Sequence, residues 1–213
     1  MDEMMRCARA GVVPVVVLER AGDALPAAEA LLSGGIDVME ITMRTPAAID
    51  AIRSVSRGLP EMLVGAGTVL TAEQGKACRD AGAAFLVSPG FCREMAQWCA
   101  EQKLSLLPGC VTPTEIMAGM ELGLRTFKFF PADVFGGLRA MKALSGPFGG
   151  IGFVPTGGVR AEDLPEYLSA PFVRAVGGSW LCKKEDIADG RFDKIRRLAV
   201  QAREAVRRAR AEA

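Results

Sequence analysis

One stretch of the sequence surrounds a lysine with phenylalanines. Lys128 lies among Phe127, Phe129 and Phe130 and is followed by Pro131. An amine in such apolar surroundings loses much of its hydration, and desolvation favours the uncharged form, which attacks carbonyl groups. Lys128 is therefore a candidate nucleophile. Two other interpretations stay open: the side chain extends from a strand end into solvent, or it belongs to a buried ion pair.

A second group of polar residues alternates with apolar ones. Glu40, Thr42 and Arg44 occupy every other position of an apolar run, so in a strand they would share one face. A carboxylate such as Glu40 is costly to bury without a partner, and Arg44 could supply one. Alternatively, Arg44 binds a substrate carboxylate with help from the hydroxyl of Thr68, and Glu40 is free to act as a general acid and base.

The absence of histidine narrows the chemistry. None of the 213 residues is a histidine, which excludes Ser-His and Cys-His nucleophile pairs and the imidazole ligands of most catalytic zinc sites. The six cysteines form no Cys-x-x-Cys pair, and most lie in apolar segments, so we interpret them as reduced core residues. Cys92 and Cys99 would share a helical face, but two thiols alone make a poor metal site. We expect neither a metal nor another cofactor.

Two glycine pairs indicate where a ligand binds. Gly157-Gly158 and Gly177-Gly178-Ser179 follow the last two predicted strands. Glycines there let backbone N–H groups approach a phosphate, and Ser179 could add a hydroxyl donor; the alternative is that they only permit tight turns. An activated amine, a proton-transfer carboxylate, a carboxylate-binding arginine and a phosphate loop together describe a phosphorylated 2-keto acid as substrate. The lysine would condense with its keto group to an iminium, which accepts electrons as a C–C bond breaks.

The elements that position these residues follow a repeating pattern. Short β-branched or aromatic runs alternate with longer stretches that carry helix signals, such as Pro46 before a helix predicted over 47–57 and the capping-box-like run Thr71 to Gln74. The pattern predicts a single (β/α)8 barrel over residues 1–213, with the polar residues at the carboxyl ends of its strands. A doubly wound open sheet is the alternative, but its glycine-rich fingerprint is absent after the first strand. The strands are expected to begin near Val12, Val38, Met62, Ala84, Leu104, Thr126, Ile151 and Phe172.

The composition and the two ends of the chain restrict the partners. A net charge of +1 lacks the basic excess of a nucleic-acid-binding protein, and no apolar run reaches the roughly 18 residues of a membrane span. The N-terminus lacks the features of a secretory signal, so we expect a cytoplasmic protein with neither a nucleic-acid nor a membrane partner. The Arg- and Ala-rich tail from about residue 192 is predicted to form a helix with a solvated basic face; a partner-binding role is the alternative.

Six motifs carry a resemblance to a known family. From about residue 6 to residue 190 the chain resembles the bacterial 2-keto-3-deoxy-6-phosphogluconate (KDPG) aldolases, which also act on 4-hydroxy-2-oxoglutarate (KHG). The resemblance implies a class I, metal-independent aldolase of the Entner–Doudoroff route that splits KDPG into pyruvate and glyceraldehyde 3-phosphate, and it implies a homotrimer. The motifs are Glu-Ile-Thr-Met-Arg-Thr at 40–45, Val-Gly-Ala-Gly-Thr-Val-Leu at 64–70, Ser-Pro-Gly at 88–90, Phe-Lys-Phe-Phe-Pro-Ala at 127–132, Pro-Thr-Gly-Gly at 155–158 and Gly-Gly-Ser-Trp at 177–180.

The resemblance also implies roles for single residues. It makes Lys128 the Schiff-base lysine and Glu40 the general acid and base, with Arg44 and Thr68 at the pyruvate carboxylate.

The resemblance also implies roles for residues that would lie around these four. Pro89 and Phe130 would pack around the pyruvyl unit, and Thr156 would meet the aldehyde-derived hydroxyl and influence stereochemistry. The segment Asp133 to Phe135 departs from the small or polar residues that the resemblance leads us to expect, which leaves the fine substrate preference open. The implied phosphate loops contain Gly157, Gly158, Gly177, Gly178 and Ser179.

Three other functions stay open. An aldolase for the galactonate epimer of KDPG would act on a substrate that differs only at C4. A phosphosugar epimerase or isomerase would also need phosphate loops and an acid/base, but no covalent lysine. A non-catalytic protein that binds phosphorylated keto acids belongs to a different class. A metal-dependent aldolase is disfavoured by the absence of histidine.

Overall fold

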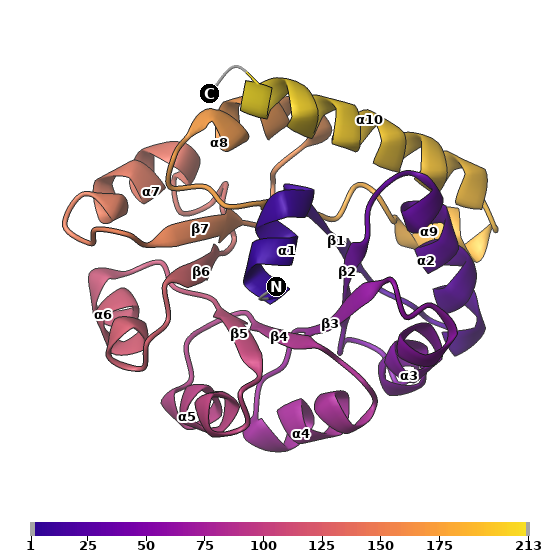
Figure 1. Ribbon diagram of the computed structural model, residues 1–213, viewed down its shortest axis with the longest axis horizontal. Coiled ribbons are helices and arrows are strands. Elements are labelled where there is room, and N and C mark those ends of the chain that lie inside the picture. Colours follow the sequence, from indigo (N-terminus) through magenta and orange to yellow (C-terminus); the bar gives the residue numbers. More distant parts are fainter. Residues whose placement is uncertain (1–2, 212–213) are drawn as a thin grey trace.

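Eight parallel strands form a closed ring inside a layer of helices (Figure 1). The computed structural model describes residues 3–211. Strands pair in the order β5-β4-β3-β2-β1-β8, and β6 pairs with β7. Single bridges close the ring: Gly109 to Lys128 joins β5 to β6, and Thr156 to Gly177 joins β7 to β8. The strands are β1 (Val12–Val16), β2 (Val38–Thr42), β3 (Leu63–Gly67), β4 (Phe85–Ser88), β5 (Ser105–Pro108), β6 (Thr126–Phe129), β7 (Gly152–Pro155) and β8 (Val176–Gly178).

This ring confirms the predicted (β/α)8 barrel, and the open-sheet alternative is wrong. In an open sheet the last strand would not return to the first, whereas here β8 pairs with β1 through Val12 and Val176. The first seven strands begin within one residue of their expected positions. The eighth begins at Val176 instead of near Phe172, because Val173 makes only an isolated bridge to Phe153 before the chain reaches β1.

The helices follow the strands around the outside of the ring. One helix signal is confirmed and one is misplaced. Thr71 is the N-cap of α4, and its hydroxyl oxygen accepts from the backbone N–H of Gln74 at 3.2 Å, while the Gln74 side chain accepts from the N–H of Leu70, one residue before the cap. Pro46 lies before the N-cap residue of α3, which is Ala47. The helices are α1 (Glu3–Ala10), α2 (Ala24–Ser33), α3 (Ala48–Gly58), α4 (Ala72–Asp80), α5 (Arg93–Glu101), α6 (Pro113–Glu121), α7 (Gly137–Ser145), α8 (Leu164–Ser169), α9 (Lys184–Ala188) and α10 (Phe192–Ala211), with short 3-10 turns η1 (Ala21–Asp23) and η2 (Ala161–Asp163).

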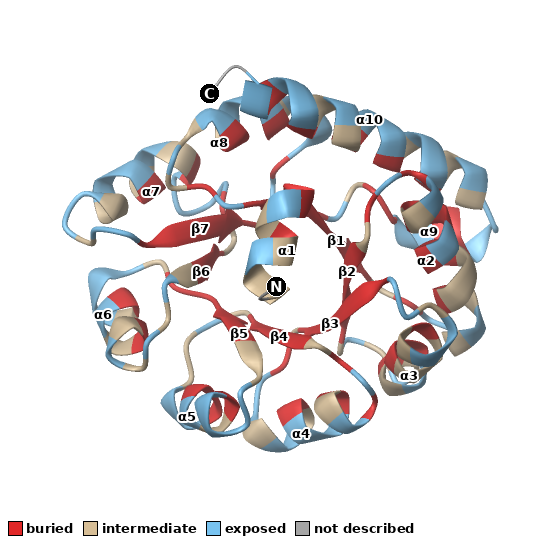
Figure 2. Ribbon diagram, viewed as in Figure 1, coloured by how far each residue is buried: buried red, intermediate tan, exposed pale blue. Residues whose placement is uncertain are grey.

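Burial follows the two-layer architecture. The strands are buried almost throughout, and the helices bury the sides that face them (Figure 2). Strands β1, β2 and β3 are buried at every position, as expected for parallel strands that are covered on both faces. A polar side chain on such a strand therefore lies in a desolvated interior unless it is at the carboxyl end.

Helix α1, which no sequence pattern predicted, covers the amino end of the ring. It lies over the middle of the ring in Figure 1, and Arg6 pairs with Asp37, just before β2, at 3.0 Å. Helix α10 holds the last turn of α1: Arg203 donates to the carbonyl of Ala10 at 2.7 Å and Arg210 to that of Arg9 at 2.9 Å. Burial lowers the pKa of both arginines from the usual value. Part of the basic tail thus has a structural role as a cap for another helix.

Within residues 3–211, no helix combines the length and the apolar character that crossing a membrane requires.

Candidate active site

A lysine and a glutamate meet inside the ring. Lys128 on β6 and Glu40 on β2 come from opposite sides of the barrel (Figure 1), and Nζ lies 3.4 Å from Oε1. The two side chains are only 5% and 4% exposed. Lys128 therefore does not extend into solvent, and the predicted buried ion pair is present, with Glu40 as the partner. The same contact brings a candidate nucleophile within proton-transfer distance of a candidate base.

The space for this pair is made by a glycine on β3. An alanine Cβ at position 67 would lie 2.0 Å from Oε1 of Glu40 and 2.6 Å from its Cδ and Cγ. Only a residue without a side chain lets the Glu40 carboxylate pass over β3 toward β6. The Gly-Ala-Gly-Thr run at 65–68 carries the signal for this space, because glycines two residues apart on a strand lie on the same face.

One aromatic side chain lies beside the amine, and two others pack on the opposite face of β6. The Phe130 ring centroid lies 5.2 Å from Nζ of Lys128, a cation–π distance. Phe127 and Phe129 are fully buried in the core, and Phe129 packs edge to face against Phe153 with centroids 5.9 Å apart. The amine therefore has one aromatic neighbour, Phe130, and one carboxylate partner, Glu40.

Arg44 lies at the rim of the barrel and does not pair with Glu40. It is exposed, and its Nε donates to Oγ1 of Thr68 at 3.2 Å. The interpretation of Arg44 as the buried partner of Glu40 is wrong, because β2 ends at Thr42 and the strand alternation ends with it. Thr42 instead donates to the carbonyl of Val16 at 3.2 Å. Thr68 has φ 57°, a value that is unusual for a β-branched residue and typical of a backbone constrained at a functional site.

The glycine loops lie side by side at the carboxyl ends of β7 and β8. A bridge joins Thr156 to Gly177, and an alanine Cβ at position 177 would lie 2.1 Å from the Thr156 hydroxyl oxygen. Gly157 has φ 88° and lies against Phe130, where a Cβ would meet the ring at 3.3 Å. Gly158 also has a positive φ.

Three more predicted residues lie near these ends. Gly178 is buried at the end of β8, and Ser179 follows it and is exposed. Pro89 follows β4, and its carbonyl oxygen lies so close to Gly109 on the next strand connection that a Cβ there would approach it to 2.0 Å. The predicted site residues therefore all lie in the barrel interior or at the carboxyl ends of its strands.

The cysteine thiols are not expected to act as nucleophiles. Burial raises the pKa of the Cys99 and Cys182 thiols to about 12. None of the six cysteines, all of which lie within residues 3–211, forms a disulfide. Among residues 3–211, no group of three or more Cys, Asp or Glu side chains is arranged to hold a metal ion.

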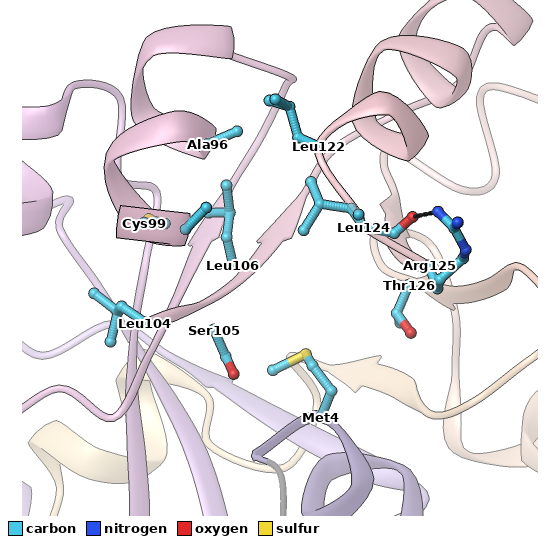
Figure 3. A pocket seen from close by; sticks show the side chains of 12 residues that line it. Met4, Ala96, Cys99, Leu104, Ser105, Leu106, Leu122, Leu124, Arg125 and Thr126 are labelled. Atoms are coloured by element: carbon cyan, nitrogen blue, oxygen red, sulfur yellow. Dashed lines mark hydrogen bonds between the residues drawn. The ribbon is translucent and has the colours of Figure 1, made fainter. Parts of the chain in front are cut away.

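A cavity of about 380 Å³ lies at the other end of the barrel (Figure 3). It opens between the starts of β5 and β6 and the side of α1. Neither Lys128 nor Glu40 reaches it, so it is distinct from the site described above. Its apolar lining includes Met4, Cys99, Leu104, Leu106, Leu122 and Leu124.

Comparison with known proteins gives the family. A family profile described as KDPG and KHG aldolase matches residues 1–198. The KHG/KDPG aldolase of Escherichia coli strain K12 is 43% identical over 191 residues, which cover 90% of each chain. The structure of KDPG aldolase from Legionella pneumophila, with pyruvate captured at low pH as a covalent carbinolamine intermediate, has a TM-score of 0.88 and 42% identity and covers 92% of this chain and 95% of that one. The KDPG aldolase of Zymomonas mobilis ZM4 with 3-phosphoglycerate has a TM-score of 0.85 and 43% identity, covering 94% and 93%. With this match over most of its length, the chain belongs to the KDPG and KHG aldolase family.

Proposed function

We propose that this chain is a class I aldolase that cleaves KDPG to pyruvate and glyceraldehyde 3-phosphate through a Schiff base on Lys128. The observation that carries the proposal is the buried contact of 3.4 Å between Nζ of Lys128 and Oε1 of Glu40. Family membership and the carbinolamine that pyruvate forms in the Legionella pneumophila relative support it. KHG, which would give pyruvate and glyoxylate, is proposed as a second substrate because the Escherichia coli relative is named for both.

The first half of the reaction forms the iminium. Glu40 takes a proton from the Lys128 amine, and the free amine attacks C2 of the keto acid to give a carbinolamine. Glu40 returns a proton to the C2 hydroxyl, which leaves as water. Lys128 is only 4% exposed, and this burial keeps bulk water away from the resulting iminium.

The second half breaks and rebuilds bonds at C3. Glu40, again a carboxylate, accepts the proton of the C4 hydroxyl while the C3–C4 bond breaks, and the bonding electrons move into the iminium to give an enamine on Lys128. The aldehyde leaves. Glu40 then supplies a proton to C3, and water hydrolyses the iminium to release pyruvate and the free amine. One carboxylate thus alternates between base and acid, as is usual for a single acid/base residue.

The residues at the rim are proposed to hold the substrate ends. Arg44, with its guanidinium exposed and bonded to Thr68, would bind the pyruvyl carboxylate, because a guanidinium matches the geometry of a carboxylate. Pro89 and Phe130 would contact the pyruvyl unit.

The loops after β7 and β8 are proposed to hold the rest of the substrate. Thr156 would meet the hydroxyl that comes from the aldehyde. Backbone N–H groups of the loops and the Ser179 hydroxyl would bind the phosphate. The glycines in this proposal are Gly157, Gly158, Gly177 and Gly178.

The test is mass spectrometry after incubation with pyruvate and borohydride. We expect one reduced pyruvate adduct, on the peptide that contains Lys128. Lys128→Ala should abolish both adduct and turnover, whereas Lys142→Ala, which removes an exposed lysine on α7, should change neither. An adduct on another lysine, or turnover near the parent level in Lys128→Ala, would overturn the assignment. An epimerase or isomerase would form no adduct.

Three broader proposals accompany the activity. We expect KDPG to be preferred over its galactonate epimer, because the similar proteins above are named for KDPG, and kcat/KM on both epimers tests this. We propose a single domain over residues 1–213 that assembles as a homotrimer, as the family resemblance implies; light scattering should give three chain masses. A cytoplasmic location is proposed because a phosphorylated sugar acid is charged and is retained inside the cell, and cell fractionation tests it.

A further inference from the structure

A threonine on the strand next to Lys128 shares its face of the barrel. Lys128 faces the interior, where its Nζ meets Glu40 of β2. It pairs in register with Val154 of β7, so Val154 has the same orientation, and Thr156, two residues further along the chain, has it too. Thr156 is only 6% exposed. Its side chain therefore lies inside the barrel, nearer to the carboxyl end than the lysine.

The backbone of Thr156 is fixed more firmly than its hydroxyl. Its N–H donates to the carbonyl of Phe129 at 2.9 Å, and its own carbonyl accepts from the N–H of Ala132 at 2.8 Å. The hydroxyl donates to the carbonyl of Val154 at 3.4 Å, which is long for a bond between two oxygens. A substrate hydroxyl can replace this weak bond at little cost.

A glycine on β8 leaves the space in which the Thr156 side chain lies. A bridge pairs Thr156 with Gly177, so both residues face the interior. An alanine Cβ at position 177 would lie 2.1 Å from Oγ1, 2.8 Å from Cγ2 and 2.9 Å from Cβ of Thr156, whereas an ordinary contact is 3.4 Å or longer. The backbone itself does not require glycine, because Gly177 has no positive φ. The threonine side chain is therefore the physical reason for a glycine at this position.

We propose that Gly177 is a positioning residue for Thr156 and, through it, determines which C4 epimer of the substrate is preferred. Without a side chain at position 177, the Thr156 hydroxyl lies over β8; a methyl group there would displace the hydroxyl first, because Oγ1 is the nearest atom. The inference rests on the proposed function, because it assumes that Thr156 meets the C4 hydroxyl of a keto acid bound to Lys128. It requires no contact between Gly177 and the substrate.

The test is a double-mutant cycle on KDPG and its galactonate epimer, with Gly177→Ala, Thr156→Ala and the double variant. Both epimers carry the same phosphate, so a lost phosphate contact would lower kcat/KM for both and leave their ratio unchanged. Loss of one hydrogen bond changes an equilibrium by roughly two- to tenfold, and we expect each single variant to lower the ratio for KDPG over its epimer by about that factor. The double variant should lower it no further, because no Thr156 hydroxyl is left to position.

Gly152→Ala is the matched control. Gly152 lies on the same strand and the same face as Thr156, but at the amino end, where it pairs in register with Thr126. A Cβ there would meet the Arg174 side chain at 2.3 Å, which is crowding of the same kind. This variant should keep the parent's epimer ratio.

Three results would refute the role of Gly177. They are a parent-like epimer ratio in Gly177→Ala, a parent-like ratio in Thr156→Ala, and single effects that multiply in the double variant. In each case pyruvate trapped on Lys128 would leave the aldolase assignment standing, whereas a parent chain without an adduct would overturn both proposals. If Gly177→Ala does not fold, urea unfolding of the double variant tests the same contact: truncation of Thr156 should restore folding, and a double variant that is equally unfolded would contradict the inference.

Discussion

Replacing Gly67 by alanine should reduce catalysis without unfolding the barrel. The new Cβ would lie 2.0 Å from Oε1 of Glu40, whereas an ordinary contact is 3.4 Å or longer. The carboxylate must therefore move by more than about 1 Å, away from a lysine that it reaches at 3.4 Å. A misplacement of about 1 Å at a reacting group can lower the rate by roughly a hundredfold, and we expect a fall in kcat of that size.

The neighbouring Gly65 on the same strand provides the control. Gly65 is the register partner of Glu40, but a Cβ there would meet three ring atoms of Phe85 at 2.3 to 2.5 Å, and Glu40 is not among the nearest atoms. Overpacking of this kind costs about 1–3 kcal/mol of stability. Gly65→Ala should therefore lower the unfolding free energy, and the protein that stays folded should keep most of its kcat. Neither glycine has a positive φ, so alanine suits the backbone at both positions.

The assay is KDPG cleavage coupled to pyruvate reduction, together with urea unfolding of both variants and pyruvate trapping by borohydride. Overpacking should lower the stability of both variants to some extent, but we expect Gly67→Ala to lose far more turnover than Gly65→Ala. A Gly67→Ala enzyme with kcat within a few-fold of the parent would show that Glu40 does not need its observed position. The reasoning would also fail if both variants lost kcat equally at equal stability.

Three further predictions concern other parts of the structure. Arg44→Ala should raise KM for the keto acid by about tenfold or more with a smaller effect on kcat, because it removes a charged hydrogen bond to the substrate, and steady-state kinetics measure this split. Arg210→Ala should lower the unfolding free energy by about 1 kcal/mol, measured in urea, because it removes a hydrogen bond to the last turn of α1. Cys99 and Cys182, whose pKa values burial raises to about 12, stay protonated at pH 8, so a thiol reagent should modify them only after denaturation.

The strand pattern was predictable from the sequence because a parallel strand is a short apolar run with turn residues on either side. That is why β1 to β7 were placed within one residue. Strand β8 was misplaced because the apolar run from Phe172 continues past an isolated bridge, and only contact with β1 decides which part pairs. Helix α1 was missed because its partners, Asp37 and the arginines of α10, are far away in the sequence.

The partner of Glu40 could not be read from the sequence. The alternation of polar and apolar residues suggested Arg44, four residues away, as the partner of Glu40. The actual partner, Lys128, is 88 residues away in the sequence and lies on the opposite side of the ring. Alternation along a strand shows which residues share a face, but the closure of the barrel decides which strand lies opposite. Likewise, the contact between Thr156 and Gly177 depends on how β7 and β8 meet. The roles that the family resemblance implies for Lys128 and Glu40 require the two side chains to lie near each other, which is confirmed, but they do not give the direct contact of 3.4 Å.

The buried pair is better explained by chemistry than by stability. Removing a lysine and a glutamate from water costs several kcal/mol per ion, and apolar residues of similar size often hold a core together as well or better. Strand β3 also leaves out a side chain at position 67, where an apolar residue could have added packing, to make room for the carboxylate. Both features weaken the core at the same point, where Nζ of Lys128 and Oε1 of Glu40 meet. A reactive amine beside a carboxylate in apolar surroundings needs this arrangement, so the site is the part of the barrel in which function, and not packing, determines the residues.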